Sequence, residues 1–180
     1  MRWLRRSPPQ SRIVYVDNDP LALVHARALL TGNPRGATDY IDSDVRDPDK
    51  ILRDAARTLD FGQPVAVMLL ATLQLISNED DPYGIVTRLM AEIPPGSYLA
   101  VSHPANDIQV EGSPPAAEEA LNRLMRGGLT LRTQAEVAPF FSGLELVEPG
   151  LVPLNRWRPD PDDKRYGGEI AIWGGVARKP

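Results

Sequence analysis

Short apolar runs alternate with amphipathic stretches along the first hundred residues. The run at 13–16 is β-branched and aromatic, and Asp-Asn-Asp-Pro and apolar positions at helical spacing follow it through residue 30. The same order, a strand-forming run and then an Asp-Pro pair that opens a helix, recurs at 38–59 and 65–93. Asp followed by Pro is a typical helix start, because Asp caps free N–H groups and Pro has none to lose. A fourth strand is expected over 97–101.

This alternation predicts the fold class. Strands that alternate with helices of about three turns indicate βαβ crossovers and a parallel sheet. The run at 65–71 is apolar on both faces, as a central parallel strand is expected to be. We therefore predict an α/β fold, with a Rossmann-like, doubly wound and mostly parallel sheet, in one domain over residues 1–180.

The last third of the chain has a different pattern. A helix is expected over 113–125, and Thr133 to Glu136 form a capping box that opens another helix. Two strands, at 144–148 and 169–173, flank a Pro-rich connection over 152–163. A terminal strand pair joined by a long loop predicts an antiparallel edge on the sheet.

Composition narrows the classes of function. Lys+Arg 20 against Asp+Glu 24 gives a formal charge of −4, which argues against a nucleic-acid-binding domain. The absence of cysteine excludes disulfides, thiolate metal sites and cysteine nucleophiles. The longest uncharged run, 61–78, contains Gly, Pro and Gln and is short of the roughly 20 apolar residues of a membrane span. We expect a cytoplasmic protein that binds neither nucleic acid nor membranes.

The carboxyl ends of parallel strands form the ligand-binding edge of an open α/β sheet, which selects a few residues. Asp17 ends the first strand, where a carboxylate can accept both hydroxyls of a ribose; it could equally cap the turn beside Asp19. Asp44 follows the second strand. Its carboxylate and the backbone N–H of Val45 could meet the amino group and ring nitrogen of an adenine, although a solvated acidic loop explains the same residues. His103 follows a later strand end and is a candidate general base.

Other motifs carry less information. The D-x-D pairs at 17–19 and 42–44 have oxygen ligands for a hard cation, but Asp19 is better used as a helix cap. His25 lies inside the first expected helix, as a surface or satisfied histidine would. No G-x-S-x-G, H-E-x-x-H or P-loop motif occurs. We predict no metal site and assign no catalytic residue.

Several segments resemble one enzyme family. Residues 14–20 with His25-Ala26-Arg27, and then 44–48, resemble motifs II and III of class I S-adenosylmethionine-dependent methyltransferases. Residues 94–99 resemble the turn before the fifth strand of that fold. The segments 143–153 and 174–180 are similar to the C-terminal signature of the actinobacterial S-adenosyl methyltransferase family (DUF574). The resemblance implies S-adenosyl-L-methionine as cofactor and a small-molecule methyl acceptor.

The resemblance also implies roles for single residues in cofactor binding. Asp17 would bind the ribose, and Asn18 would lie against the adenine. Asp44 and Val45 would contact the adenine edge. Leu70, near the end of the central apolar strand, would border the methionine moiety of the cofactor.

Two further positions are assigned to the methyl acceptor. Gln74 falls where the family is expected to have a histidine beside the methyl-transfer site, and this departure leaves the identity of the substrate open. His103 borders the same edge of the sheet.

The front of the chain departs most from the family pattern. Class I methyltransferases begin with a strand and a glycine loop of the Asp-x-Gly-x-Gly kind, yet no G-x-G occurs in this sequence. Only 12 residues precede Ile13, whereas a βαβ unit needs roughly 30. We therefore expect a truncated domain without its first strand. Uncovered neighbouring strands would forfeit about 1.5–3 kcal/mol per apolar side chain, so self-association into a homo-oligomer is one expected consequence.

Two other interpretations stay open. A methyltransferase-like scaffold without turnover, a pseudoenzyme, would also lack the glycine loop. Residues 13–21 also resemble the start of a haloacid dehalogenase-like phosphatase, four apolar residues and then D-x-D, with Ser102 as its second motif. That interpretation needs a well-placed lysine, and none of Lys50, Lys164 and Lys179 follows the required pattern.

Overall fold

The computed structural model describes residues 11–21, 24, 36–109, 127–160 and 170–180. They belong to two compact units, Met1–Gln63 and Pro64–Pro180, and each is described by itself. The helix expected over 113–125 lies outside the described residues, as do His25 and most of the helix expected over 21–30. The prediction of a single domain over 1–180 stays a prediction.

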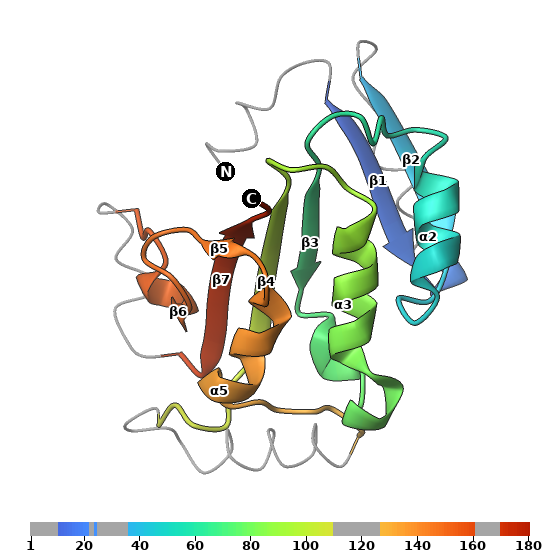
Figure 1. The fold of residues 1–180 in the computed structure, drawn as a ribbon. Coiled ribbons are helices and arrows are strands. Elements are labelled where there is room, and N and C mark those ends of the chain that lie inside the picture. The colour runs from blue at the N-terminus through green and yellow to red at the C-terminus, as the bar shows by residue number, and fades with distance from the viewer. Residues whose placement is uncertain (1–10, 22–23, 25–35, 110–126, 161–169) are drawn as a thin grey trace. The chain divides into compact units, whose positions relative to one another are not determined.

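The elements described in the first unit include two parallel strands and a helix (Figure 1). Strand β1 (Arg12–Asp17) pairs with β2 (Ala37–Asp42) over their whole length, so that the last residues of both strands lie opposite each other. Helix α2 (Pro48–Ala55) begins at the expected Asp-Pro pair, where the Asp47 side chain accepts a hydrogen bond from Lys50 N at 3.0 Å. Both strand predictions and the helix start are confirmed.

The second unit contains a five-stranded mixed sheet. Its strands are β3 (Ala66–Leu70), β4 (Tyr98–Pro104), β5 (Glu145–Leu146), β6 (Val152–Pro153) and β7 (Ile172–Arg178). The order is β3-β4-β7-β5, and β6 also pairs with β7. Strands β3 and β4 are parallel, whereas β7 is antiparallel to β4, β5 and β6. The predicted α/β fold with antiparallel C-terminal strands is confirmed.

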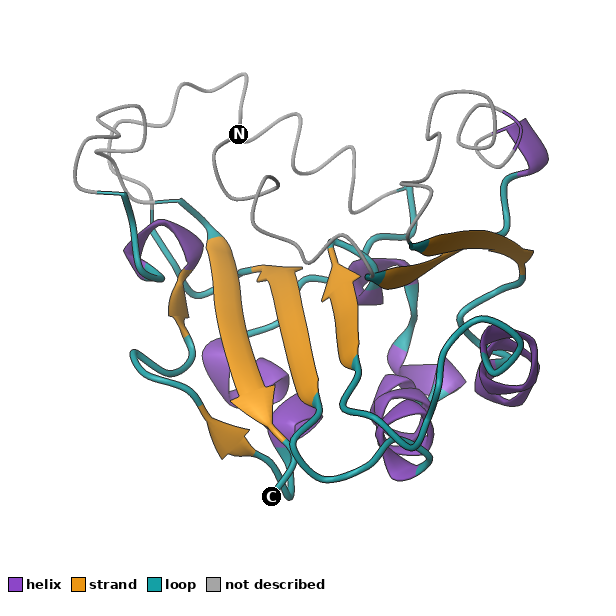
Figure 2. Cartoon of the chain, turned by 90° about the horizontal axis from the view of Figure 1, so that it is seen from above, coloured by secondary structure: helices purple, strands orange, loops and turns teal. Residues whose placement is uncertain are grey.

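Helices of the second unit cover one face of this sheet (Figures 1 and 2). They are α3 (Pro82–Ala91), α5 (Gln134–Val137) and the 3₁₀ turn η4 (Ala138–Phe141). The predicted capping box opens α5: the Thr133 hydroxyl accepts from Glu136 N at 3.2 Å, and the Glu136 carboxylate accepts from Thr133 N at 2.8 Å. Three further 3₁₀ turns are η2 (Leu73–Leu75), η3 (Asn78–Asp80) and η5 (Leu154–Arg156).

The predicted bounds of the last strand were wrong. The strand was expected over 169–173, but β7 begins at Ile172 and continues through Gly174 and Gly175 to Arg178. Glycine pairs weaken a strand signal in the sequence. Packing favours glycine most at Gly175, where a Cβ would lie 2.9 Å from Phe141 Cζ, and a Cβ on Gly174 would lie 2.6 Å from the terminal methyl Cδ1 of Leu154.

Strand β4 is longer than the expected 97–101. Pairing with β7 extends it to Pro104, and His103 lies opposite Trp173. His103 is therefore part of the strand and not of the segment that follows it.

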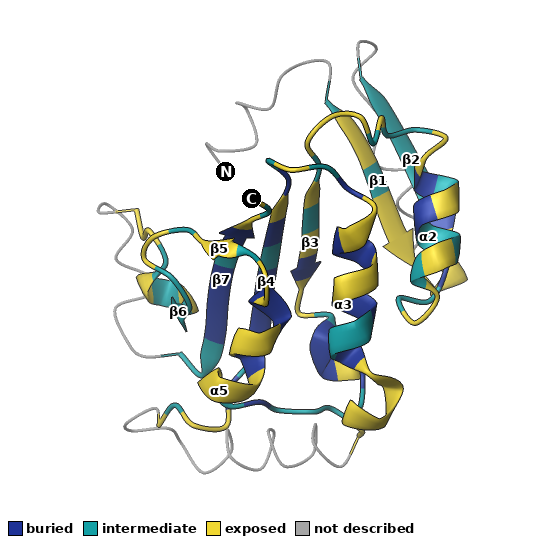
Figure 3. Ribbon diagram, in the orientation of Figure 1, coloured by how far each residue is buried: buried dark blue, intermediate teal, exposed yellow. Residues whose placement is uncertain are grey.

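Burial differs strongly between the strands (Figure 3). Most of β4 and β7 is buried, whereas Met68 and Leu70 of β3 are 63% and 50% exposed. In the first unit, Ile13 and Tyr15 of β1 are 39% and 42% exposed. Among the described residues, β1 and β3 each pair with one other strand, so each has a free edge with apolar side chains beside it.

Candidate functional site

The carboxyl ends of β1 and β2 bring the first group of predicted residues together. Asp17 is opposite Asp42 in the register, and Ser43 N donates to Asp17 O at 3.1 Å, which continues the pairing beyond β2. The turn at 44–47, closed by a 3.0 Å hydrogen bond from Asp47 N to Asp44 O, follows directly. Ligands of open α/β sheets bind at this edge.

Asp17 is exposed and begins a tight turn. Its Oδ1 accepts from Asp19 N at 2.9 Å, and Asp19 Oδ1 accepts from Leu21 N at 2.8 Å. Asp17 therefore does shape the turn, as one of the two sequence interpretations stated. Within the described part of the chain no donor is placed on its other carboxylate oxygen, which leaves that atom open to a ligand hydroxyl.

Asp44 is the centre of a small hydrogen-bonded cluster. Its Oδ2 accepts from Asn18 Nδ2 at 3.1 Å and from Arg46 Nη1 at 2.9 Å, and its Oδ1 accepts from Arg46 N at 2.9 Å. The backbone hydrogen bond from Arg46 contributes most to lowering the pKa of Asp44, and the Arg46 charge and the Asn18 amide lower it further. Asp44 is therefore ionised at neutral pH, and Asn18 links the end of β1 to the loop after β2.

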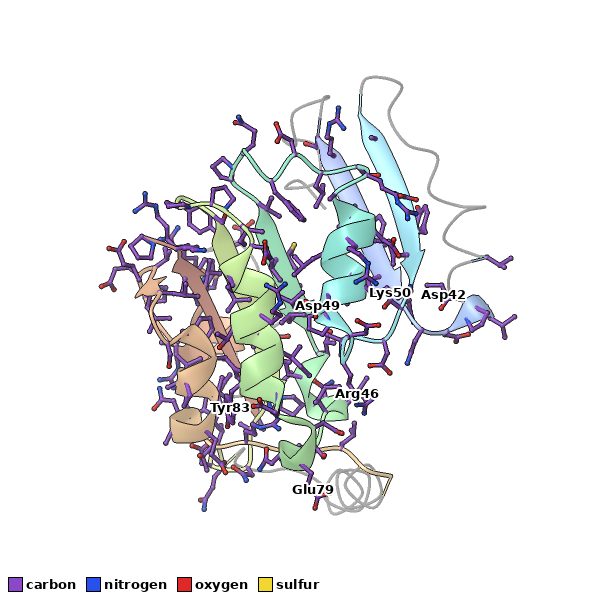
Figure 4. All side chains as sticks on the ribbon, turned by 45° about the vertical axis from the view of Figure 1, so that its right-hand side comes forward. Asp42, Arg46, Asp49, Lys50, Glu79 and Tyr83 are labelled. Atoms are coloured by element: carbon purple, nitrogen blue, oxygen red, sulfur yellow. The ribbon has the colours of Figure 1, made fainter. Side chains whose placement is uncertain are left out.

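The loop between β2 and α2 is also tied at its far end. Lys50 Nζ donates to the carbonyl oxygen of Asp42 and lies 3.6 Å from the Asp54 carboxylate (Figure 4). Val45, in the turn, is half-buried, and its backbone N–H has no acceptor among the described residues. An ionised acceptor at Asp44 and an open donor at Val45 thus lie on adjacent residues.

The second group of predicted residues, Leu70, Gln74 and His103, lies near the carboxyl ends of β3 and β4. Leu70, the last residue of β3, is half-exposed and lies opposite Ser102. Ala71 follows with a φ of +54°, a left-handed conformation that is uncommon for a residue with a Cβ. Its N–H donates to Ser102 Oγ at 3.0 Å, which holds the chain in this bend.

Gln74 lies in η2 and is buried. Its carbonyl oxygen accepts from Thr130 N at 2.8 Å. Its side-chain oxygen Oε1 is enclosed and has no donor among the described residues. A buried amide oxygen without a donor costs about 1–3 kcal/mol, so this atom is a natural acceptor for a ligand O–H or N–H group.

His103 is fully buried, with both ring nitrogens in hydrogen bonds. Nδ1 lies 2.9 Å from Pro104 O, and Nε2 lies 2.8 Å from Arg132 Nη1. Because arginine only donates, Nε2 must accept and Nδ1 carries the proton. Burial lowers the pKa of His103 most, and the Arg132 charge lowers it further. The imidazole is neutral, and its assignment to the methyl acceptor stays a prediction.

Arg132 is a buried residue that the sequence did not single out. It directly precedes the capping box that begins at Thr133, but a capping box gives no role to the residue before it, so no local signal could have marked Arg132. Its contacts come from β4 and from the loop after β3, segments far from it in the sequence.

A hollow of about 250 Å³ in the second unit lies at the other end of β4. Its lining includes Met90 of α3, Phe140 and Lys179. Lys179 N donates to Ser97 O at the amino end of β4, so this hollow is not at the carboxyl edge where Gln74 lies. It therefore carries none of the predicted site residues.

The two groups of predicted residues are distributed as follows. Asp17, Asn18, Asp44 and Val45 lie together in the first unit, and Leu70, Gln74 and His103 lie at one end of the sheet in the second. In the described ranges, no three His, Asp or Glu side chains are placed to hold a metal ion.

The parallel strands of the first unit, with acidic residues at their carboxyl ends, and the mixed sheet of the second, with the antiparallel β7 beside β4, are features of Rossmann-like α/β proteins. The S-adenosyl methyltransferase family model matches residues 3–180, and the chain belongs to this family. S-adenosyl-L-methionine is the cofactor of the family.

Two solved structures are similar to this chain in both sequence and fold. A DUF574 family protein from Streptomyces avermitilis MA-4680 is 42% identical with a TM-score of 0.83, and the match covers 96% of this chain and 66% of that one. A "putative methyltransferase" from Thermobifida fusca YX is 38% identical with a TM-score of 0.73, covering 93% of this chain and 63% of that one. The chain thus spans slightly less than two thirds of the length of these relatives.

A more distant structure shares the fold alone. The N-methyltransferase NodS from Bradyrhizobium japonicum WM9, in complex with S-adenosyl-L-homocysteine, is 11% identical with a TM-score of 0.54, covering 94% of this chain and 67% of that one. No curated protein matches the chain. None of the helices in the described ranges is long and apolar enough to cross a membrane.

Proposed function

We propose that this chain contributes the adenosine-binding residues and the acceptor-side residues of an S-adenosylmethionine-dependent methyltransferase that acts on a small molecule. The observation that carries the proposal is the register of β1 and β2, which brings Asp17 and the Asp44 loop to one edge. Membership of the family supports S-adenosylmethionine as the cofactor. That the methyl acceptor is a small molecule is an expectation from the sequence alone.

The residues at this edge fit an adenosine. An adenine presents an amino donor beside a ring-nitrogen acceptor, and the ionised Asp44 and the open Val45 N–H are their complements on adjacent residues. Asn18 holds Asp44 in place through its 3.1 Å hydrogen bond. The open carboxylate oxygen of Asp17 suits the hydroxyls of a ribose.

The residues of the second unit suit the other parts of the reaction. The cofactor supplies a methyl group on a sulfonium, whose transfer depends mainly on alignment and the exclusion of water. The half-exposed Leu70 offers an apolar contact for the methionine moiety. The Oε1 atom of Gln74, which is buried and has no donor among the described residues, is the acceptor that we assign to the hydroxyl or amine that is methylated.

A titration of S-adenosylhomocysteine into the protein tests the cofactor site. Asp17→Ala removes charge-assisted hydrogen bonds worth about 1.5–3 kcal/mol, so the affinity should fall by roughly tenfold or more. Asp60→Ala is the matched control, because Asp60 Oδ1 accepts from Gly62 N at 2.9 Å in the same kind of turn as Asp17, away from the strand ends. Equal affinities in the wild type and Asp17→Ala would overturn the assignment.

The methionine end of the cofactor needs a part that residues 1–180 do not carry. The sequence has no G-x-G, and the match leaves about a third of each of the two similar structures uncovered.

Cytoplasmic location follows from the sequence analysis as part of the same proposal. No observation in the described residues and no comparison favours the phosphatase or the inactive scaffold.

A further inference from the structure

One arginine side chain joins four groups in the interior of the second unit. Arg132 is 1% exposed. Its Nη1 donates to Leu73 O at 3.0 Å and to His103 Nε2 at 2.8 Å. Its Nη2 donates to Ile76 O at 3.0 Å and to Asn78 Oδ1 at 2.7 Å. Three of these four acceptors belong to one short segment, so the guanidinium fixes that segment relative to β4.

The fixed segment is the loop that follows β3, residues 71–80, which we call the β3 loop. It begins with the left-handed bend at Ala71, held by Ser102 of β4, and it contains η2 and η3. Thr130 N donates to the carbonyl oxygen of Gln74 in its middle at 2.8 Å. The β3 loop is thus attached to β4 and to the segment around Arg132, and it carries Gln74.

The chemistry of Arg132 suits positioning better than simple core packing. All four acceptors are neutral, and no described carboxylate forms an ion pair with the guanidinium. Burying such a charge is costly, and an apolar side chain of similar volume is often equally stabilising. A guanidinium instead offers several donors in fixed directions within one plane, which lets it hold several oxygens at once.

We propose that Arg132 is a positioning residue for the acceptor side of the site: it sets the conformation of the β3 loop and thereby the place of Gln74. This inference rests on the proposed function for what the β3 loop binds. The part of the inference that concerns the conformation of the β3 loop is independent of the proposed function and can be measured separately.

Hydrogen exchange at Leu75 and Ile76 measures the loop conformation, because both amides are hydrogen-bonded within η2. Asn78→Ala removes one acceptor of Arg132 at an exposed residue, and exchange at both amides should rise by about fivefold to tenfold, as expected for one lost hydrogen bond. Asn78→Asp keeps an acceptor and should restore slow exchange. Arg132→Lys should raise exchange at both amides as Asn78→Ala does. If Arg132→Lys does not fold, the comparison of Asn78→Ala with Asn78→Asp decides.

Ser77→Ala is the matched control. It removes the 2.9 Å hydrogen bond from Ser77 Oγ to Asp80 Oδ2, which is also in the β3 loop but does not involve Arg132. Exchange at Leu75 and Ile76 should stay at the wild-type rate. Amides of β7 should exchange alike in all variants, which separates a local change from global destabilisation.

S-adenosylhomocysteine affinity links the loop to the site, since Leu70 directly precedes the bend. Asn78→Ala should weaken binding by about threefold or more and lower the melting temperature by only a few degrees, and Asn78→Asp should do neither. Unchanged exchange at Leu75 and Ile76 in Asn78→Ala overturns the proposal. If the wild type does not bind at all, the proposed function fails, and the exchange comparison alone decides whether Arg132 positions the β3 loop.

Discussion

The ring of His103 is enclosed by Phe140, Arg132 and the backbone of Pro104. Burial and the Arg132 charge lower its pKa, while the Pro104 carbonyl and the Glu136 carboxylate act in the opposite direction without prevailing. Protonation would remove the acceptor for Arg132 and place two cations 2.8 Å apart. The neutral ring is therefore a condition of the native packing.

A pH dependence of stability follows at the scale of this residue. His103 binds a proton near pH 6.5 in the unfolded chain and only at lower pH in the folded chain. The free energy of unfolding should therefore have its full contribution from His103 above pH 6.5 and should decrease as the pH falls below that value. Each unit by which the pKa is lowered corresponds to about 1.4 kcal/mol. Urea unfolding at pH 7.5 and pH 5.5 measures the loss.

The variant His103→Gln tests the origin of that loss. A glutamine can accept from Arg132 but does not titrate, so the variant should be less stable at pH 7.5 and should lose less between pH 7.5 and pH 5.5. An equal loss in both proteins would show that other groups cause the acid sensitivity.

At the scale of elements, β7 depends on close packing at its two glycines. A Cβ on Gly175 would meet the ring of Phe141, which is 4% exposed and cannot move away. A Cβ on Gly174 would come closer to its neighbour, but that neighbour is a terminal methyl of Leu154, which is 39% exposed. The contact with Phe141 therefore restricts substitution more than the contact with Leu154, although its distance of 2.9 Å is longer than the 2.6 Å to Leu154.

Alanine substitutions in β7 should separate these two contacts. Gly175→Ala should lower the free energy of unfolding by about 1–3 kcal/mol, as overpacking in a core usually does. Gly174→Ala should cost less than about 1 kcal/mol, because Leu154 can change rotamer. Thermal or urea unfolding of both variants provides the comparison, and a larger cost for Gly174→Ala would contradict the argument.

The elements that were predicted well are those whose signals are local. Asp47-Pro48 and Asp81-Pro82 open helices, and Thr133 begins a capping box, because capping acts within one helical turn. The extent of β7 was not predictable, since its glycines are explained only by side chains from η4 and η5.

The positions of the candidate residues follow the same division. The proximity of Asp17 and Asp44 could be predicted because parallel pairing places strand ends at one edge. The burial of His103 could not, because it depends on β7 and Arg132, which lie far from it in the sequence. Arg132 itself has no local signal, and only tertiary contacts reveal it.

At the scale of the whole molecule, the edge of β3 that pairs with no strand among the described residues predicts self-association with a second copy of the chain. The strand Ala66–Leu70 is apolar throughout and has neither the charges nor the proline that usually protect an exposed edge. Light scattering after size exclusion should therefore give a dimer or larger species. A wild-type protein that is monomeric at all concentrations would contradict this prediction.

A charge on the edge strand should reverse the association. Met68→Lys places a lysine at a side chain that is 63% exposed, so it should favour the monomer without disturbing the core. Leu154→Lys, at an exposed leucine of η5 away from β3, is the matched control and should leave the species unchanged.

Strand β7 follows every other described strand in the sequence, yet it lies between β4 and β5 in the sheet. On the ribosome, β4 is therefore complete several seconds before Ile172 is made, at about 5–20 residues per second. During that interval the edge of β4 that later pairs with β7 has no strand partner, and the sheet of the second unit is incomplete. Nascent chains stalled before residue 172 should be digested by protease over 64–160, whereas chains with β7 outside the ribosome should resist.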